Sequence, residues 1–312
     1  MSDYSLMVYN YKTYPVKTAN LGDYIQSLAA KQFLPGVSGY IDRDDAAAYS
    51  GPKTKMIMNG WYKMSPGNEN IPGNIIPLYI SVHISDKALS PAAVKNFKKY
   101  EPIGCRDMYT SELLNKYGVK TYFSGCLTLT LGKTYSSAEK TDEIIFTDAF
   151  LKKRFFNIFI SAQRKRQRFA VSPSERAKFL LPENLEENIV YQTHDAPLDS
   201  SHEERFALAE KLLRRYARAK FVITNRLHAV LPCVAVGTPA ILLFNKFDAS
   251  RYKGLSDFFN YYSLKSGGSR IETKNIDLPS GGTALRVVNP QAYIPYKKSL
   301  EETVENFINK NL

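Results

Sequence analysis

The sequence is poor in cysteine and in long apolar runs, and each shortage excludes a class of protein. Its 312 residues include only three cysteines, Cys105, Cys126 and Cys233, in apolar or turn contexts without metal-ligand spacing. We therefore expect buried thiols, and neither a disulfide framework nor a zinc site. No stretch approaches the roughly 18 apolar residues that cross a bilayer, so no transmembrane helix is predicted.

The N-terminal residues also lack the basic region and the apolar core of a secretory signal. They run directly into a predicted strand, Ser5 to Tyr9. We therefore expect a cytoplasmic protein.

Acidic residues are scarce relative to basic ones. The chain has 30 Asp and Glu against 42 Lys and Arg, which gives a formal net charge of +12. Such a surplus indicates a polyanionic partner: nucleic acid, an anionic membrane face or a phosphorylated substrate. Nucleic acid is not expected, because the sequence has neither a recognised nucleic-acid module nor basic residues interleaved with aromatic ones on a predicted sheet.

Strand-like and helix-like segments alternate in two series, which predicts an α/β fold with mostly parallel strands. A polar stretch from Gly132 to Thr141 separates the series and reads as a linker. We expect two Rossmann-like lobes with a central cleft, residues 1–135 and 142–285, followed by a helical tail, 286–312, that packs back across the lobes. The predicted strands are 5–9, 54–59, 75–84, 103–106, 120–123, 144–146, 188–192, 220–223 and 240–244; the predicted helices are 21–33, 91–100, 110–117, 203–217, 229–236 and 298–311.

A short segment, Thr224 to Ala229, places a guanidinium and an imidazole where a strand changes into a helix. The carboxyl ends of parallel strands are where α/β proteins bind ligands. If the segment is extended, the side chains of Arg226 and His228 point to the same side and could hold an anion. The alternative is a surface arginine and a structural core histidine, and the spacing does not decide between them.

Two other strand-to-helix junctions carry candidate residues. Asn20-Leu21-Gly22-Asp23 opens the first helix, where free backbone N–H groups face the cleft. Asp23 is a candidate general base, but Asn20 and Asp23 are also good capping residues. Arg106 ends a short strand and suits a bidentate grip on carboxylate or phosphate, unless it forms a structural pair with Asp107. His83 and His194 follow other strands, each as a cleft residue or a structural histidine.

A basic segment with an aromatic and aliphatic centre follows the linker. Its composition suits an anionic membrane surface. It equally suits a helix that packs its apolar residues on the second lobe and exposes a basic face. The basic residues are Lys152, Lys153, Arg154, Arg164, Lys165, Arg166 and Arg168.

In order and spacing, five segments together resemble the polysaccharide pyruvyl transferase family, over most of residues 5–258. The resemblance implies a fold similar to GT-B glycosyltransferases and transfer of the pyruvyl group of phosphoenolpyruvate to a sugar as a ketal. It implies no obligatory metal or nucleotide, so phosphoenolpyruvate is a co-substrate and no cofactor is expected. The segments are Asn20–Ser27, Asn59–Trp61, Cys105–Leu114, Ser124–Thr128 and Asn225–Pro239.

The same resemblance assigns roles to individual residues. It places donor binding at Arg106 and at the Arg226-Leu227-His228 turn, which agrees with the need of phosphoenolpyruvate for two cationic anchors. Addition of a sugar hydroxyl to C2 requires a proton at C3, which His228 supplies unless it serves only as a phosphate ligand. Asp23 accepts the hydroxyl proton or orients the sugar. The acceptor-binding residues are expected to be Asn20, Asp23, Asn59 and His83.

The expected acceptor is a sugar of a bacterial surface polysaccharide or of its precursor. Such precursors are commonly built on a polyprenyl diphosphate at the inner face of the cytoplasmic membrane, where the basic segment would hold the protein as a peripheral enzyme. Two rival functions stay open. One is a GT-B glycosyltransferase that uses a nucleotide sugar, and the other is a non-catalytic subunit of a polysaccharide assembly complex.

Overall fold

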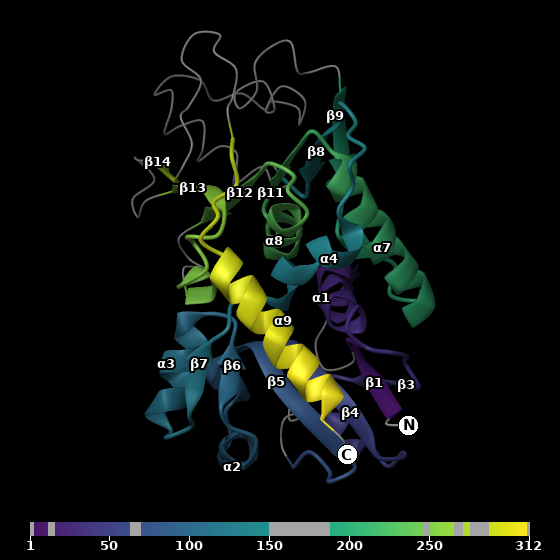
Figure 1. Cartoon of the computed structure of the whole chain (residues 1–312), viewed down its shortest axis with the longest axis vertical. Coiled ribbons are helices and arrows are strands. Elements are labelled where there is room, and N and C mark those ends of the chain that lie inside the picture. Colours follow the sequence, from purple (N-terminus) through teal and green to yellow (C-terminus); the bar gives the residue numbers. More distant parts are fainter. Residues whose placement is uncertain are drawn as a thin grey trace.

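Two six-stranded sheets form the framework of the protein, with strand orders β3-β1-β4-β5-β6-β7 and β14-β13-β12-β11-β8-β9. The computed structural model describes residues 3–11, 16–62, 70–149, 188–245, 250–264, 271–274 and 287–310. Within these sheets every described pairing is parallel except that of β13 with β14. Figure 1 shows the first sheet in the lower half of the molecule and the second in the upper half. The prediction of an α/β fold with mostly parallel strands is confirmed.

The strands of the first sheet are β1 (Asp3–Val8), β3 (Gly39–Asp42), β4 (Thr54–Tyr62), β5 (Ile75–Ile84), β6 (Ile103–Cys105) and β7 (Thr121–Phe123). Those of the second are β8 (Ile144–Thr147), β9 (Ile189–Gln192), β11 (Phe221–Thr224), β12 (Ala240–Asn245), β13 (Asn260–Leu264) and β14 (Ile271–Lys274). A separate antiparallel pair is formed by β2 (Ala19–Asn20) and β10 (Asp195–Ala196). The described helices are α1 (Leu21–Lys31), α2 (Pro91–Lys99), α3 (Met108–Lys116), α4 (Gly132–Tyr135), α7 (His202–Arg218), α8 (Leu227–Ala235) and α9 (Ile294–Asn309), with 3-10 turns at Ala46–Ala48, Asp86–Ala88 and Leu127–Thr130.

Several helices begin at residues whose side chains accept hydrogen bonds from the first free backbone N–H groups. Asn20 caps α1, Ser90 caps α2 and Asp107 caps α3. At the start of α7 the side chain of Ser201 accepts from the backbone of Glu204, whose own side chain accepts from the backbone of Ser201. These caps fix where each helix starts, and that of Asp107 starts α3 shortly after β6 of the first sheet ends.

The two lobes meet around α1. This helix packs against α7 and α8 of the second lobe. The β2–β10 pair sets Asn20 opposite Asp195, and the backbone N–H of Leu21 donates to the carbonyl of His194 at 2.7 Å. The second lobe therefore holds the N-terminus of α1 in place.

The C-terminal helix packs back across both lobes, as predicted. In Figure 1, α9 runs from the second sheet toward the first, and both chain ends lie near the first sheet. Two residues of α9, Leu300 and Val304, are buried. The buried ammonium of Lys55 donates to the backbone carbonyls of Phe307 (2.9 Å), Ile308 (3.0 Å) and Lys310. These carbonyls at the end of α9 lack helical partners, so Lys55 fixes the helix to the first lobe.

Several local predictions need correction. Helix α9 begins at Ile294, four residues before the predicted start. The stretch 132–141 is not wholly a linker, because α4 forms in its first part, where the carbonyl of Leu131 accepts from the N–H groups of Thr134 and Tyr135. Helix α8 begins at Leu227, two residues before the predicted start. The three cysteines are free and buried, which confirms the expectation of buried thiols. Among the described helices, none combines the length and apolarity needed to cross a membrane.

Candidate functional site

The carboxyl ends of β4, β5 and β6 meet at one edge of the first sheet, and polar side chains gather there. The β4–β5 register shifts between Met58 and Gly60, where Gly60 has φ 118°. Ser81, opposite this irregularity in β5, also has a positive φ, 58°. Such a bulge re-aims the side chains that follow it. Asn59 lies at the bulge, Trp61 and His83 follow it, and Arg106 and Asp107 come next along the sheet.

Arg106 is fully buried, with 0 % of its surface exposed. None of its three guanidinium nitrogens has a hydrogen-bond partner among the described residues. Its nearest carboxylate oxygen is Oδ2 of Asp107, 3.6 Å from Nε. A buried charge without hydrogen bonds is costly, by several kcal/mol. Burial lowers the pKa of Arg106 for this reason. An anionic ligand would supply the missing hydrogen bonds.

Asp107 and His83 form a pair beside this guanidinium. His83 Nδ1 lies 2.7 Å from Asp107 Oδ2, and Asp107 Oδ1 accepts from the backbone and the hydroxyl of Thr110, both at 2.9 Å. Burial and the charge of Arg106 lower the pKa of His83 to about 4, although Asp107 opposes the shift. His83 is therefore neutral at pH 7 and donates from Nδ1, which leaves its Nε2 as an acceptor. The predicted Arg106–Asp107 pair exists, but the main partners of Asp107 are His83 and Thr110.

Asp23 lies in the first turn of α1 and is buried. Its carboxylate accepts from the hydroxyl of Tyr11 at 3.1 Å and from Nε2 of Gln26 at 3.3 Å. Burial raises the pKa of Asp23 to about 6, and the hydrogen bonds of Tyr11 and Asn20 limit the rise. A carboxyl with this pKa suits proton transfer near neutral pH.

The predicted acceptor residues Asn20 and Asn59 serve α1 in this structure. The side chain of Asn20 accepts from the backbone of Gly22 at 3.1 Å, so the capping interpretation holds for Asn20. Nδ2 of Asn59 donates to the carbonyl of Gln26 at 2.8 Å. Oδ1 of Asn59 is buried and has no hydrogen-bond partner in the described part of the chain.

His228 reaches the site because α8 is kinked at this residue. Pro232 lies inside the helix and lacks the N–H that would bond to the carbonyl of His228, four residues earlier. His228 accordingly has non-helical angles, φ −84° and ψ 21°. A Cβ added to Gly22 would lie 3.3 Å from Cβ of His228 and 3.4 Å from Nδ1 of His194, so both imidazoles pack against the first turn of α1.

His228 is buried, and its Nε2 has no hydrogen-bond partner among the residues that the structure describes. Burial, then the charges of Arg106 and Arg251, hold the pKa of His228 well below its ordinary range. The imidazole is therefore neutral in the unliganded protein. A bound anion would offset these positive charges and raise the pKa of His228.

Arg226 faces a different set of groups. Its Nε lies 2.6 Å from Oδ2 of Asp148 and its Nη2 lies 3.2 Å from Oδ1 of Asp195. The backbone is extended at Arg226 but not at His228, so the condition for both side chains to share a side is not met. The side chain of Leu227 is buried in the core. Arg226 thus joins three segments of the second lobe.

Sequence reasoning missed Arg251, assigned no role to Trp61 although it lies in one of the five segments, and left His194 undecided. Cζ of Arg251 lies 4.7 Å from the centre of the Trp61 ring, which lies 5.8 Å from the ring of His83. His194 is fully buried, with Nε2 2.8 Å from the hydroxyl of Tyr216. A signal for Arg251 was its place shortly after a strand of the second series, the position that drew attention to Arg106.

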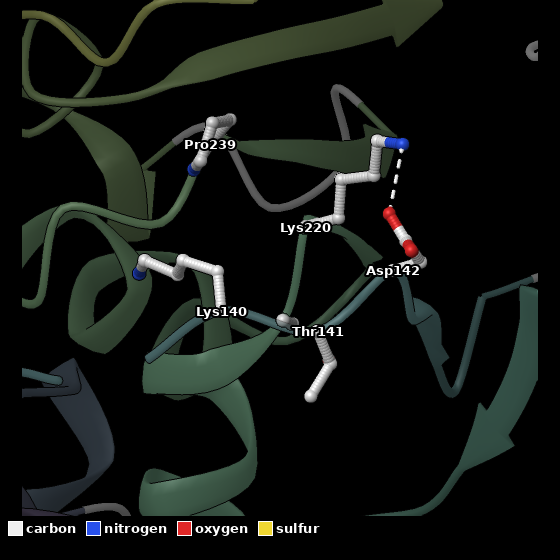
Figure 2. A pocket seen from close by; sticks show the side chains of 6 residues that line it. Lys140, Thr141, Asp142, Lys220 and Pro239 are labelled. Carbon is white, nitrogen blue, oxygen red and sulfur yellow. Dashed lines mark hydrogen bonds and ion pairs between the residues drawn. The ribbon is translucent and has the colours of Figure 1, made fainter. Parts of the chain in front are cut away.

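A depression on the second lobe lies away from this cluster (Figure 2). Its lining residues directly precede β8, β11 and β12, so it lies at the amino ends of these parallel strands. Lys220 and Asp142 pair across it at 3.2 Å. None of the predicted site residues lines it. The lining residues are Lys140, Thr141, Asp142, Ala219, Lys220 and Pro239.

The predicted membrane-binding residues, between Lys152 and Arg168, lie outside the described residues. Membrane binding by this segment stays a prediction.

Comparison with solved structures gives distant likenesses. An uncharacterised protein of Klebsiella pneumoniae matches with 12% identity and a TM-score of 0.45, over 82% of this chain and 88% of its own. The E. coli heptosyltransferase WaaC, solved with ADP, matches with 14% identity and a TM-score of 0.34, over 86% and 94%. At TM-scores this low, neither likeness bears on what the chain does.

No curated protein sequence matches the chain. The sequence model of the polysaccharide pyruvyl transferases, in contrast, matches residues 20–246. This range is more than half of the chain, and it runs from the cap of α1 through the Arg106 and His228 junctions to the end of β12. The chain belongs to the polysaccharide pyruvyl transferase family.

Proposed function

We propose that the protein transfers the pyruvyl group of phosphoenolpyruvate to a sugar of a bacterial surface polysaccharide, or of its lipid-linked precursor, and forms a cyclic ketal. Family membership supports a transferase that acts on a polysaccharide. The observation that carries the donor assignment is Arg106, a fully buried guanidinium without hydrogen-bond partners among the described residues. A small substrate with a carboxylate and a phosphate would satisfy it.

The donor is bound by Arg106 and by the start of α8. Leu227 contributes its backbone N–H and not its buried side chain, because the first N–H groups of a helix have no helical partners and attract anions. His228 contributes its imidazole from the same turn. Arg226 closes this side of the site through its ion pairs with Asp148 and Asp195, and it reaches the donor only if a pair opens.

The first chemical step joins a sugar hydroxyl to C2 of phosphoenolpyruvate. The hydroxyl oxygen forms the new bond as its proton passes to Asp23, and C3 takes a proton from His228 to become a methyl group. The bound dianion raises the pKa of His228 and so lets it carry that proton. The product is a tetrahedral adduct that still holds the phosphate.

The second step closes the ketal. The bond from C2 to the phosphate oxygen breaks, and the phosphate leaves with the bonding electron pair. A second hydroxyl of the same sugar then adds to C2 and gives its proton to the released phosphate, while the proton held by Asp23 returns to His228 through solvent. The net products are the ketal and one inorganic phosphate, so the reaction needs no redox partner or further cofactor. We assign Nε2 of His83 and Oδ1 of Asn59 as the atoms that accept hydrogen bonds from hydroxyl groups of the sugar.

The test is incubation with phosphoenolpyruvate and defined bacterial saccharides, free and polyprenyl-linked. We expect phosphate release that depends on the acceptor, together with a mass gain of one pyruvyl ketal. Arg218→Ala is the matched control, because Arg218 is an exposed arginine paired with Glu139. Turnover of a nucleotide sugar without phosphate release would identify the rival glycosyltransferase. An unchanged Arg106→Ala variant would indicate a non-catalytic subunit.

A further inference from the structure

The hydroxyl of Tyr11 connects the proposed proton acceptor to the start of α1. It accepts from the backbone N–H of Asn20 at 3.0 Å. Two acceptors lie within reach of its single proton, Oδ2 of Asp23 and the carbonyl oxygen of Asn20, each at 3.1 Å. Tyr11 therefore bonds both to the residue that caps α1 and to the carboxylate in its first turn.

Tyr11 is held in place by its own backbone and by both lobes. Its φ is 56°, a left-handed conformation that is rare and costly for a bulky residue. Its ring stacks on that of Tyr9 with the centres 6.3 Å apart, and Cζ of Arg205 in α7 lies 5.8 Å from its centre. Asn20, its backbone partner, pairs with Asp195 of the second lobe. A strained backbone that persists beside a buried carboxylate points to a functional role.

The carboxylate of Asp23 is held at both of its oxygens. Tyr11 donates to Oδ2, and Nε2 of Gln26 donates to Oδ1 at 3.3 Å. A bond at each oxygen fixes the plane of the carboxylate. Because each carboxylate oxygen can accept two hydrogen bonds, a substrate hydroxyl can still bind there.

The Tyr11 hydroxyl can serve both protonation states of Asp23. An ionised carboxylate is a stronger acceptor than a peptide carbonyl, so the hydroxyl donates to Asp23 while that group is ionised. After Asp23 takes a proton, the hydroxyl can turn to the carbonyl of Asn20 without losing a bond. Tyr11 keeps its own proton throughout, because burial and the charge of Asp23 raise its pKa.

The hydrogen bond of Tyr11 is the largest of the effects that oppose burial at Asp23. Burial raises the pKa of Asp23, whereas this bond favours its ionised form. The tyrosines near Asp23 have raised pKa values themselves, so they stay neutral at pH 7. The titratable and charged groups that interact with Asp23 are Tyr9, Tyr11 and Tyr24 of the first lobe, Arg106 after β6 and Arg251 of the second lobe.

We propose that Tyr11 is the positioning residue of Asp23, whose carboxylate it holds in one orientation before and after proton transfer. Tyr11 itself neither gains nor loses a proton. The inference rests on the proposed function for the role of Asp23 as the acceptor of the sugar proton.

The test compares wild type, Tyr11→Phe and the control Tyr49→Phe. Tyr11→Phe keeps the packing of the ring and removes only the hydroxyl. The Tyr49 hydroxyl donates to the carbonyl of Pro52 at 3.0 Å, so the control loses a tyrosine hydrogen bond of another kind. Carbon-13 NMR of the aspartate carboxyl carbons measures the pKa of Asp23, whose signal is identified by its absence from Asp23→Asn. Phosphate release measures kcat and KM as functions of pH.

In Tyr11→Phe the pKa of Asp23 should rise by about one pH unit or more, since a hydrogen bond to its ionised form is lost. The acidic limb of the kcat profile should move by the same amount. On the high-pH plateau kcat should fall about tenfold, because the carboxylate is no longer held in one orientation. The KM for phosphoenolpyruvate should stay within about twofold of wild type, and Tyr49→Phe should match wild type throughout.

An unchanged pKa of Asp23 in Tyr11→Phe would overturn the proposal, and so would a loss of activity confined to KM. A raised pKa of Asp23 in Tyr11→Phe, in a protein whose wild type releases no phosphate from phosphoenolpyruvate with any acceptor, would refute the proposed function and leave the coupling of Tyr11 to Asp23 standing.

Discussion

Replacing Asp23 by Asn should make the protein more stable and less active. The pKa of Asp23 is raised by burial to about 6, above its ordinary value of 3.8. The folded protein therefore holds this proton more tightly than the unfolded chain does. Protonated Asp23 therefore contributes its full stabilisation of the folded protein at pH values below its pKa in the unfolded chain. This contribution is lost as pH rises through about 4 to 6.

The size of the effect follows from the shift. A difference of about two pKa units corresponds to about 3 kcal/mol of unfolding free energy once Asp23 is fully ionised. Asn has nearly the same shape, can accept from Tyr11 and does not ionise. The advantage of Asp23→Asn over wild type should grow from about 1 kcal/mol at pH 4.5 to about 3 kcal/mol at pH 8.

Urea denaturation followed by circular dichroism measures the free energy of unfolding of both proteins at each pH. Subtracting the wild-type value from that of the variant cancels the contributions of groups that titrate alike in both proteins. Turnover of the variant should fall about 100-fold at pH 7 to 8, because the proton acceptor is gone. An advantage that stays constant or shrinks as pH rises would mean that folding does not raise the pKa of Asp23.

Three further substitutions test the rest of the site. Gly22→Ala adds a Cβ 3.1 Å from Oδ1 of Asn20 and 3.3 Å from Cβ of His228. We expect turnover to fall about tenfold, whereas the thermal midpoint should stay within a few degrees of wild type because the higher helix propensity of Ala offsets the crowding. A wild-type turnover would show that the packing of His228 against Gly22 is not critical. His228→Ala should lose about 100-fold or more in kcat in a phosphate-release assay, and a loss confined to KM would make His228 a ligand only. Arg106→Lys should raise the Kd for phosphoenolpyruvate about tenfold or more by calorimetry, since an ammonium cannot replace a bidentate guanidinium; an unchanged Kd would remove Arg106 from the donor site.

The elements that were predicted well have strong local signals. The strand 75–84 matches β5 in both bounds, because a long apolar run specifies a strand buried in a parallel sheet. The long helix 203–217 differs from α7 by one residue at each end, where a capping box marks the start. The β2–β10 pair was missed because strands of two residues have no periodicity, and their pairing joins distant parts of the chain.

The site was only partly predictable, since its contacts depend on tertiary packing. Junctions after strands identified Arg106 and His228 as candidates. Nothing local shows that Arg226 meets Asp148 and Asp195, which lie 78 and 31 residues away in sequence. One signal was present in the sequence: Pro232 lacks the N–H that would bond to the carbonyl of His228, and the helix is kinked there.

Carbon-13 NMR directly tests the formation of a ketal from phosphoenolpyruvate. Phosphoenolpyruvate labelled at C2 is supplied with an acceptor saccharide, and the glycan is isolated. We predict that the label appears in the sugar as a saturated ketal carbon, with one phosphate released for each label incorporated. A label that stays in unreacted phosphoenolpyruvate, or that enters the glycan as an unsaturated enolpyruvyl ether, would contradict it.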